Sequence, residues 1–230
     1  MFANNEIGTM QPIRELCSLA HSKDVLFHTD AVQAVGHVKI DVQELGVDML
    51  SASAHKFNGP KGIGFLYIRK GTKIIPYANG GAQENGMRAG TENIASIVGM
   101  SIALKNNCTK LSESAKHVND IENELISILK ENNLDFIRNG ENQTPGNISL
   151  SFKNWDGELI LHRLDLMGVC ISTGSACDGK SNRISHVLKA IHMPAEYATG
   201  TIRIYLNKDN TMEEIKYIAN CLVSLLSNKQ

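Results

Sequence analysis

The stretch SASAHKFNGPKGIG, residues 51–64, places a histidine and a lysine side by side between small residues and a turn-rich loop. Small residues let a ligand approach the backbone closely, and glycine and proline hold a loop in tight turns. In an open α/β sheet, the residues just beyond the carboxyl ends of the strands line the ligand crevice. We therefore expect Lys56 to lie in such a crevice, with a solvent-exposed loop lysine as the ordinary alternative.

The sequence around this stretch alternates between helical and extended patterns. The patterns predict a helix that follows Pro12 and carries residues 16–20, a helix over 42–45, strands over 25–29, 48–53 and 64–69, and a further candidate strand at 74–75. Such alternation is typical of a mostly parallel sheet covered by helices. The first 100 residues are therefore predicted to be α/β.

A second region, rich in longer helices, follows. Its predicted helices cover residues 92–104, 111–130, 158–167, 183–191 and 211–227, and its predicted strands cover residues 136–137, 147–152, 169–172 and 201–206. Thr211 and Glu214 fit a capping box at the start of the last helix. No linker rich in proline, glycine or serine separates the two regions, so we expect a rigid boundary and a ligand cleft between them.

The charge balance excludes several classes of partner. The chain has 23 Lys and Arg against 24 Asp and Glu, a net charge of −1, and no long basic block. Nucleic acid and anionic membranes are therefore not expected partners. Apolar runs fall short of the roughly 20 residues of a bilayer span, and the N-terminus lacks the pattern of a signal peptide. We expect a cytoplasmic protein with small or neutral ligands.

The five cysteines are not arranged for disulfides or zinc, because their number is odd and no C-x-x-C pair occurs. Cys17, Cys170 and Cys221 fall in apolar elements and are predicted to be buried in the core. His186 and His192 have a spacing that fits no ordinary zinc site, so they are interpreted as structural. No metal is expected.

Asp30 follows the predicted strand 25–29, so it should share a sheet edge with Lys56. A lysine in a desolvated pocket becomes a nucleophilic amine that forms Schiff bases with carbonyl cofactors. Pyridoxal 5'-phosphate is such a cofactor, and it also requires a carboxylate that keeps its ring nitrogen protonated. Asp30 is the candidate for that carboxylate.

Four short motifs occur in a fixed order along the chain: HTDAVQ at 28–33, SAHK at 53–56, MRAGT at 87–91 and TGSAC at 173–177. In this order they resemble cysteine desulfurases of the NifS/IscS type, which have the class V aminotransferase fold. The resemblance runs nearly from end to end. It implies a PLP-dependent transferase (aspartate aminotransferase-like) fold, with 1–100 as the C-terminal part of the large PLP-binding domain and 101–230 as a smaller α+β domain carrying the catalytic cysteine.

The resemblance also implies roles for residues of the first region. Lys56 is expected to carry pyridoxal phosphate, with Asp30 at the pyridine nitrogen and Gln33 at the phenolic oxygen. Ser53 and His55 match phosphate contacts, and His55 is also expected among the catalytic residues.

Three further residues match binding positions of the family. Thr91 matches a threonine that contacts the phosphate in the neighbouring subunit, which implies a homodimer; a helix N-cap is an additional role for it. Asn5 and Arg203 match the residues that bind the substrate carboxylate, for which a planar guanidinium is well suited. A structural arginine is the alternative for Arg203.

Cys177 matches the catalytic cysteine, and its small polar neighbours predict an exposed, mobile loop. The resemblance implies that L-cysteine is converted to L-alanine while its sulfur is transferred to Cys177 as a persulfide. A sulfur acceptor or iron–sulfur scaffold protein would then collect it for cluster assembly or thiolation. Lys180 and Arg183 could favour the thiolate, whereas Asp178, which departs from the family pattern, opposes it.

The family has a longer N-terminal portion, with a histidine that stacks on the cofactor and a further phosphate-binding threonine. Neither can be located in this sequence, which predicts a truncated or split chain with exposed sheet edges and apolar faces that favour aggregation. The alternatives to a cysteine desulfurase are a selenocysteine lyase, an aminotransferase-like PLP enzyme, and a non-catalytic remnant that only binds a partner or dimerises.

Overall fold

The computed structural model describes residues 1–174 and 184–227. The chain forms two compact units: unit 1 consists of Met1–Ala3 and Gln11–Leu111, and unit 2 consists of Asn4–Met10 and Ser112–Gln230. The short segment Asn4–Met10 therefore belongs to unit 2, although unit 1 residues flank it on both sides. The predicted domain boundary after residue 100 falls inside helix α3 (Ile94–Thr109).

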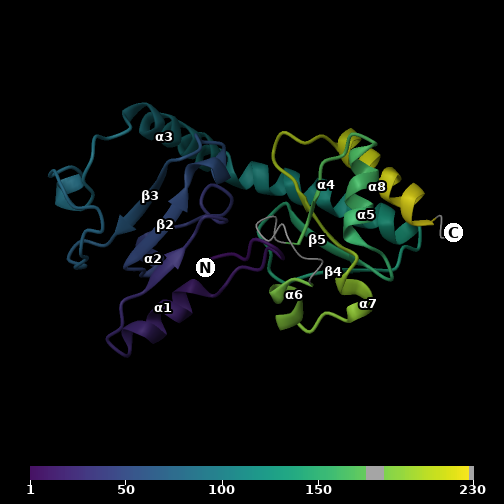
Figure 1. Ribbon diagram of the computed structural model, residues 1–230, viewed down its shortest axis with the longest axis horizontal. Coiled ribbons are helices and arrows are strands. Elements are labelled where there is room, and N and C mark those ends of the chain that lie inside the picture. Colours follow the sequence, from purple (N-terminus) through teal and green to yellow (C-terminus); the bar gives the residue numbers. More distant parts are fainter. Residues whose placement is uncertain (175–183, 228–230) are drawn as a thin grey trace. The chain divides into compact units, whose positions relative to one another are not determined.

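Unit 1 is built on a three-stranded sheet with the order β1 (His28–Asp30), β2 (Met49–Ser53) and β3 (Gly64–Ile68). β1 is parallel to β2 and β3 is antiparallel to it, so this sheet is mixed rather than mostly parallel. The helices of the unit are α1 (Ile13–His21), α2 (Val42–Leu45) and α3 (Figure 1). α2 lies in the crossover that lets β1 and β2 run in the same direction.

The local sequence explains where these elements begin and end. The Asp41 side chain accepts hydrogen bonds from two N–H groups of α2, and Gly46 ends this helix with φ of 75°. The predicted strand 25–29 starts only at His28, because the N–H of Val25 donates to the Ala20 carbonyl and closes the turn after α1. Residues 74–75 form no strand in the structure.

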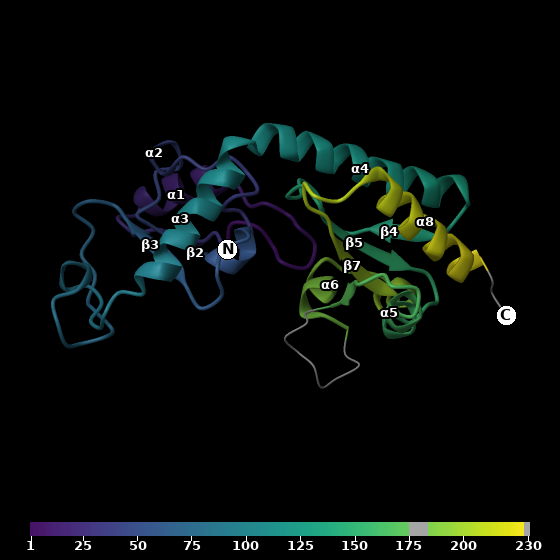
Figure 2. The same cartoon turned by 90° about the horizontal axis from the view of Figure 1, so that it is seen from above.

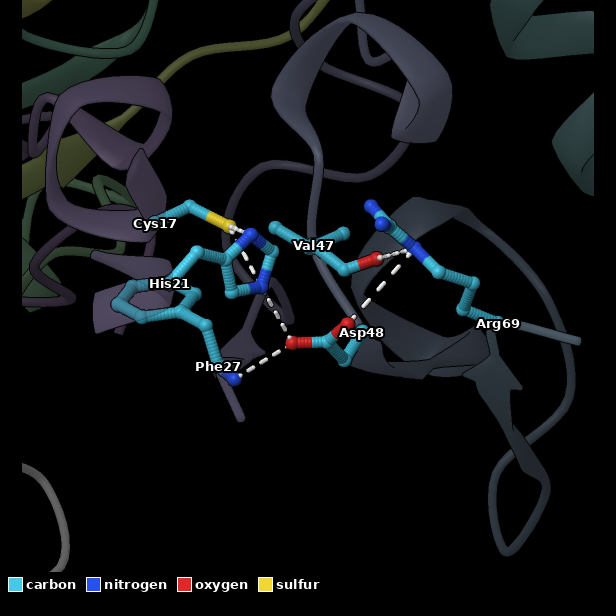
Figure 3. Close-up of polar contacts among 6 residues, drawn as sticks. All are labelled: Cys17, His21, Phe27, Val47, Asp48 and Arg69. Atoms are coloured by element: carbon cyan, nitrogen blue, oxygen red, sulfur yellow. Dashed lines mark hydrogen bonds and ion pairs between the residues drawn. The ribbon is translucent and has the colours of Figure 1, made fainter. Parts of the chain in front are cut away.

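A buried carboxylate holds the amino end of β2 to its neighbours (Figure 3). Asp48 is 5% exposed; its Oδ2 lies 2.7 Å from Nε2 of His21 and accepts the N–H of Phe27 at 2.8 Å. Its Oδ1 lies 3.8 Å from Nε of Arg69. Burial by itself raises the pKa of Asp48, but the hydrogen bonds from His21 and Phe27 and the nearby cationic groups bring that pKa below its ordinary value.

Cys17 completes this cluster, with its Sγ 3.7 Å from Nε2 of His21. Burial, reinforced by the charge of Asp48, raises the pKa of the Cys17 thiol. The predicted core positions of Cys17 and Cys221 are confirmed. The prediction for Cys170 is wrong: the strand there is only β6 (Ser172–Thr173), Val169 points inward, and Cys170 is exposed.

Unit 2 contains a four-stranded antiparallel sheet with the order β4 (Phe136–Arg138), β5 (Asn147–Phe152), β7 (Thr201–Tyr205) and β6. Its helices are α4 (Leu111–Glu131), α5 (Gly157–Asp165), α6 (His186–Ala190), α7 (Ala195–Ala198) and α8 (Met212–Ser227). Figure 2 shows α4 and α8 alongside this sheet. α7 was not anticipated from the sequence, and α6 is shorter than the predicted helix over 183–191.

The core of unit 2 is one continuous cluster that joins β5 and β7 to α4, α5 and α8. Every residue of β5 is buried. Two of its polar side chains are paired, since Nδ2 of Asn139 donates to the hydroxyls of Ser149 and Ser151, each at 2.9 Å, whereas the buried Oδ1 of Asn147 has no partner among the described residues. The predicted capping box is confirmed: the N–H of Thr211 donates to the Glu214 carboxylate, and the N–H of Glu214 donates to Oγ1 of Thr211.

Unit 1 leaves large apolar side chains in contact with solvent. Ile94, Val98 and Ile102, spaced four residues apart along α3, are 66%, 51% and 55% exposed, and Leu66 on β3 is 48% exposed. These positions agree with the expectation of exposed apolar faces, while aggregation stays a prediction. None of the helices described in the two units is long and apolar enough to cross a lipid bilayer.

Candidate active site

The candidate cofactor residues of unit 1 gather at one edge of its sheet. β1 ends at Asp30 and β2 ends at Ser53, and because these strands are parallel, both carboxyl ends lie at the same edge. Asp30 is the register partner of Ser51. The one-turn helix η1 (Ala54–Phe57) follows β2 directly and carries His55 and Lys56.

The sequence of η1 sets which of its side chains face solvent. Ala54 and Phe57 are buried, whereas His55 and Lys56 are exposed. Asn58 ends the turn in the left-handed region, and a Cβ at Gly59 would lie 2.8 Å from the Ala54 Cβ. A glycine is therefore needed where the chain doubles back on η1.

Two side chains from outside hold the backbone of η1. Nδ2 of Asn107 in α3 donates to the Phe57 carbonyl at 2.6 Å, and the ring Nε2 of His37 donates to the Lys56 carbonyl at 2.8 Å. Both bonds satisfy carbonyls that a one-turn helix leaves without an internal partner. The backbone under Lys56 is thus fixed while its amine stays exposed.

The polar side chains at this edge keep free hydrogen-bonding capacity. Oδ1 of Asp30 accepts the N–H of Val32 at 2.9 Å, and among residues 1–174 and 184–227 its Oδ2 has no partner. Oγ of Ser53 lies 2.9 Å from Nδ1 of His55. Gln33 follows in the turn after Asp30 and is half-buried. Lys56 makes no ion pair with any described residue, and it is exposed rather than enclosed in the crevice expected from the sequence.

This donor set fits the chemical parts of pyridoxal phosphate. The Lys56 amine suits its aldehyde, and the open Asp30 oxygen suits a protonated ring nitrogen. The paired hydroxyl and imidazole of Ser53 and His55 suit the phosphate. The residues that could hold the cofactor in this unit therefore lie on β1, β2 and the turns that follow them.

Thr91 lies between η2 (Glu84–Gly86) and α3, and it is exposed. Its expected additional role as a helix cap is wrong, because the residue that caps α3 is Asn93. Oδ1 of Asn93 accepts the N–H of Ser96 at 3.3 Å. The structure describes no hydrogen bond between Thr91 and the residues at the sheet edge.

The two predicted carboxylate-binding residues meet in unit 2. Nη1 of Arg203 on β7 donates to the Asn5 carbonyl at 2.8 Å. The segment that carries Asn5 is folded by its own sequence, since Oδ1 of Asn4 accepts the N–H groups of Glu6 and Ile7. A guanidinium has five N–H donors, so this bond orients Arg203 and leaves other donors for a carboxylate.

Cys177, with Asp178, Lys180 and Arg183, lies outside the described residues. Two carboxylates that bind residues on either side of the undescribed stretch 175–183 were not predicted from the sequence. Glu158 accepts a hydrogen bond from Thr173, and Glu6 accepts one from Ser185. The sequence offers one clue to each carboxylate. Glu6 directly follows Asn5, and Thr173, the partner of Glu158, begins the TGSAC motif.

Comparisons with known proteins agree with this arrangement. The family model for aminotransferase class V matches residues 1–218. The cysteine desulfurase IscS of Dictyoglomus turgidum is 49% identical over 228 residues, which cover 98% of this chain and 58% of that protein. A solved NifS-like protein is 39% identical with a TM-score of 0.89, covering 99% of this chain and 60% of its own.

A solved structure of SspA in complex with cysteine is 35% identical with a TM-score of 0.72, and the match covers 91% of this chain and 58% of that one. The chain thus spans about three fifths of the length of the relatives it matches. The family model nevertheless covers nearly all of this sequence, and the solved relatives share its fold along most of its length. The chain belongs to the aminotransferase class-V family.

Proposed function

We propose that this chain acts in cysteine desulfuration, in which L-cysteine is converted to L-alanine and its sulfur is transferred to Cys177. The observation that carries the proposal is the parallel pairing of β1 and β2, because it places Asp30 at the same sheet edge as Ser53 and the Lys56 turn. The 49% identity to the cysteine desulfurase of Dictyoglomus turgidum supports the reaction class. The cysteine bound to SspA, a relative of the same fold, supports the substrate.

In this proposal unit 1 holds the cofactor. Lys56 would hold its aldehyde through the side-chain amine, and Asp30 would keep a proton on its ring nitrogen. Gln33 donates to the phenolic oxygen, while Ser53, His55 and Thr91 contact the phosphate, His55 also serving in catalysis. The chemistry that bound pyridoxal phosphate supplies is an electron-accepting ring that stabilises negative charge on the substrate carbon.

Unit 2 supplies the substrate and sulfur contacts. Asn5 and Arg203 bind the substrate carboxylate, with the Arg203 guanidinium already oriented by the Asn5 carbonyl. The Cys177 thiolate attacks the substrate sulfur: the S–S bond forms, the Cβ–S bond breaks, and its electron pair stays with Cβ. Cβ then takes a proton, so the products are L-alanine and a Cys177 persulfide, and no external oxidant is needed.

The proposal extends to partners and setting. A Thr91 that contacts the phosphate of a neighbouring subunit requires a homodimer. The persulfide requires an acceptor, which we propose to be a sulfur-acceptor or iron–sulfur scaffold protein in the cytoplasm. Iron–sulfur cluster assembly or thiolation would then consume the sulfur.

The test uses the 230-residue chain purified with pyridoxal phosphate. We expect a visible absorption band, and sulfide and alanine released from L-cysteine in the presence of a reducing thiol. Lys56→Ala should lose the band and the activity, whereas Lys61→Ala, a loop lysine in the same stretch, should keep both. Cys177→Ser should keep the band and lose sulfide release.

Other outcomes identify the alternatives. Sulfide release that survives Cys177→Ser would contradict the persulfide route. Faster turnover of L-selenocysteine than of L-cysteine indicates a selenocysteine lyase, and keto acid in place of alanine indicates an aminotransferase. A folded chain with no absorption band and no turnover is the outcome that the non-catalytic remnant predicts.

A further inference from the structure

The groups that suit pyridoxal phosphate lie at two separate turns of unit 1. The first consists of residues 31–38, here called the β1 turn, which directly follows Asp30 at the end of β1. The second is η1, which follows β2 and carries Lys56. A ring held by Lys56 can meet Asp30 only if the two turns keep a fixed position relative to each other. Contacts between them therefore bear on the chemistry.

The β1 turn is fixed by its own backbone. Val35 and Val38 each donate an N–H, at 3.0 Å, to the carbonyl four residues earlier. Ala31 and Ala34, to which those carbonyls belong, are both 0% exposed. The turn thus forms two overlapping helical turns that are anchored on buried residues, and His37 lies near its end.

His37 joins the β1 turn to η1. Its ring Nε2 donates to the Lys56 carbonyl at 2.8 Å. The preceding residue, Gly36, has φ of 80°, and a Cβ there would lie 2.8 Å from the Cβ of Phe57. Any other residue at this position would push the two turns apart. The β1 turn therefore packs directly on η1 where His37 binds the Lys56 carbonyl.

Asn107 holds η1 from a third element, the helix α3. Its Nδ2 donates to the Phe57 carbonyl at 2.6 Å. Its Cβ would lie 3.5 Å from a Cβ at Gly36, so Asn107 also reaches the β1 turn. Lys56 and Phe57 are consecutive residues, and each of their carbonyls thus receives a side-chain donor from outside η1. The Lys56 backbone is held from two directions.

We propose that His37 and Asn107 are positioning residues that hold η1 against the β1 turn, so that a single ring meets both Lys56 and Asp30. The inference rests on the proposed role of Lys56 and not on the fate of the substrate sulfur. Both bonds end on backbone carbonyls, so their removal displaces the lysine and leaves its amine chemically unchanged. The effect should fall on the covalent attachment of the cofactor.

The experiment compares His37→Ala, His37→Gln, Asn107→Ala and Asn107→Asp in the full chain. A glutamine keeps an N–H donor in place of the ring Nε2, whereas an aspartate keeps the shape of Asn107 and removes its donor. These two variants keep most of the side-chain volume, so they decide the matter if an alanine variant does not fold. The matched control is Asn106→Ala, which removes an exposed asparagine from the same helix.

Covalent attachment is the first readout. The Lys56 amine and the aldehyde of pyridoxal phosphate condense with loss of one water, and borohydride then reduces the C=N bond to a stable amine. Samples quenched with borohydride at successive times give the rate of attachment by peptide mass spectrometry. We expect the rate to fall about three- to tenfold in His37→Ala and in both Asn107 variants, the scale of one hydrogen bond. His37→Gln and Asn106→Ala should stay within about twofold of the parent.

Binding of pyridoxamine phosphate separates positioning from general damage to the site. This molecule keeps the ring nitrogen and the phosphate but has an amine in place of the aldehyde, so it forms no bond with Lys56. Its Kd, measured by calorimetry, should change by less than about twofold in every variant, because Asp30 and Ser53 are the last residues of β1 and β2. An equal weakening for both molecules would contradict a positioning role.

Hydrogen exchange tests the hold on η1 without any cofactor. The N–H groups of Asn58 and Gly59 donate to the Ala54 carbonyl and close this turn. They should exchange faster in His37→Ala and Asn107→Ala than in the parent or in Asn106→Ala.

The outcomes distinguish this inference from the proposed function. Attachment at the parent rate in the alanine variants would overturn the inference, as would an equal loss in Asn106→Ala or no recovery in His37→Gln. A parent chain that attaches no pyridoxal phosphate to Lys56 would overturn the role of Lys56 and this inference together. A parent chain that attaches it but releases no sulfide would contradict the proposed function alone, and the variants would still decide the positioning role.

Discussion

The two ends of the unit 1 sheet each carry an aspartate, and the two side chains have opposite surroundings. At the amino end of β2, Asp48 is buried and is contacted by His21, the Phe27 N–H and Arg69. At the carboxyl end of β1, Asp30 is exposed and, within the part of the chain that the structure describes, accepts one backbone hydrogen bond. The same residue type in one sheet therefore serves two purposes.

The difference follows from the direction of the strands. β1 and β2 are parallel, so the chain segments that enter them, from α1 and α2, lie at one edge and can close around Asp48. The turns that leave them lie at the other edge, where ligands bind in open α/β sheets. Full hydrogen bonding stabilises the first edge, whereas unsatisfied polar groups at the second edge are available to a cofactor.

The largest expected effect is on chemistry at the open end of the unit 1 sheet, the edge at which β1 ends with Asp30. Asp30→Asn should lower alanine release from L-cysteine by about a hundredfold or more, the scale of a lost proton-holding group. Its unfolding free energy should stay within about 0.5 kcal/mol of the parent, as for other exposed substitutions. Steady-state kinetics and urea denaturation measure the two quantities. An Asp30→Asn variant that keeps parent kinetics would contradict the proposed role of Asp30 at the cofactor.

The free energy of unfolding should respond to substitution at the closed end of this sheet, the edge at which Asp48 precedes β2. Asp48→Ala leaves the Phe27 N–H and the His21 ring without their acceptor, and we expect a loss of about 1–3 kcal/mol in unfolding free energy. Hydrogen exchange in α1 and β1 reports the loss locally, and Asp30→Ala is the matched control. If both alanine variants unfold at the same denaturant concentration, burial does not distinguish the two ends.

Patterns in the sequence located the open end because its residues follow predicted strands at short spacing. A strand that ends next to Asp30, a strand that ends at Ser53 and the turn that holds Lys56 can all be derived from local periodicity and strand direction. Within unit 2, Arg203 was placed by the resemblance, and its partner Asn5 lies 198 positions away. The structure brings those two together by packing that no local pattern encodes.

The errors have the same origin. His21 and Asp48 are 27 positions apart, and neither belongs to a recognisable motif, so their contact was not predicted. Thr91 and Asn93 are both reasonable N-caps by residue type, and only the backbone shows that Asn93 caps α3. Cys170 is exposed because the strand there is two residues long, and apolar neighbours alone do not reveal strand length.

The smallest effect concerns pH and again separates the two aspartates. The pKa of Asp48 is lower in the folded chain than its ordinary value, so folding favours its charged form. Its contribution to stability is complete above the ordinary pKa of about 3.9 and is lost as the pH falls through the lower folded-state value. Asp48→Asn cannot titrate, so the gap in unfolding free energy between parent and variant should narrow below about pH 4.

Urea denaturation of parent and Asp48→Asn at each pH measures this gap, and taking the difference cancels the protonation of carboxylates elsewhere in the chain. Asp30→Asn provides the contrast at pH 7, because replacing an exposed carboxylate with a single backbone bond should change the unfolding free energy by less than about 0.5 kcal/mol. A gap for Asp48→Asn that persists unchanged at pH 3, or that widens there, would mean that the charge on Asp48 does not stabilise the folded unit. The closed end of the sheet would then owe its stability to packing around Cys17 and Leu50 rather than to the carboxylate.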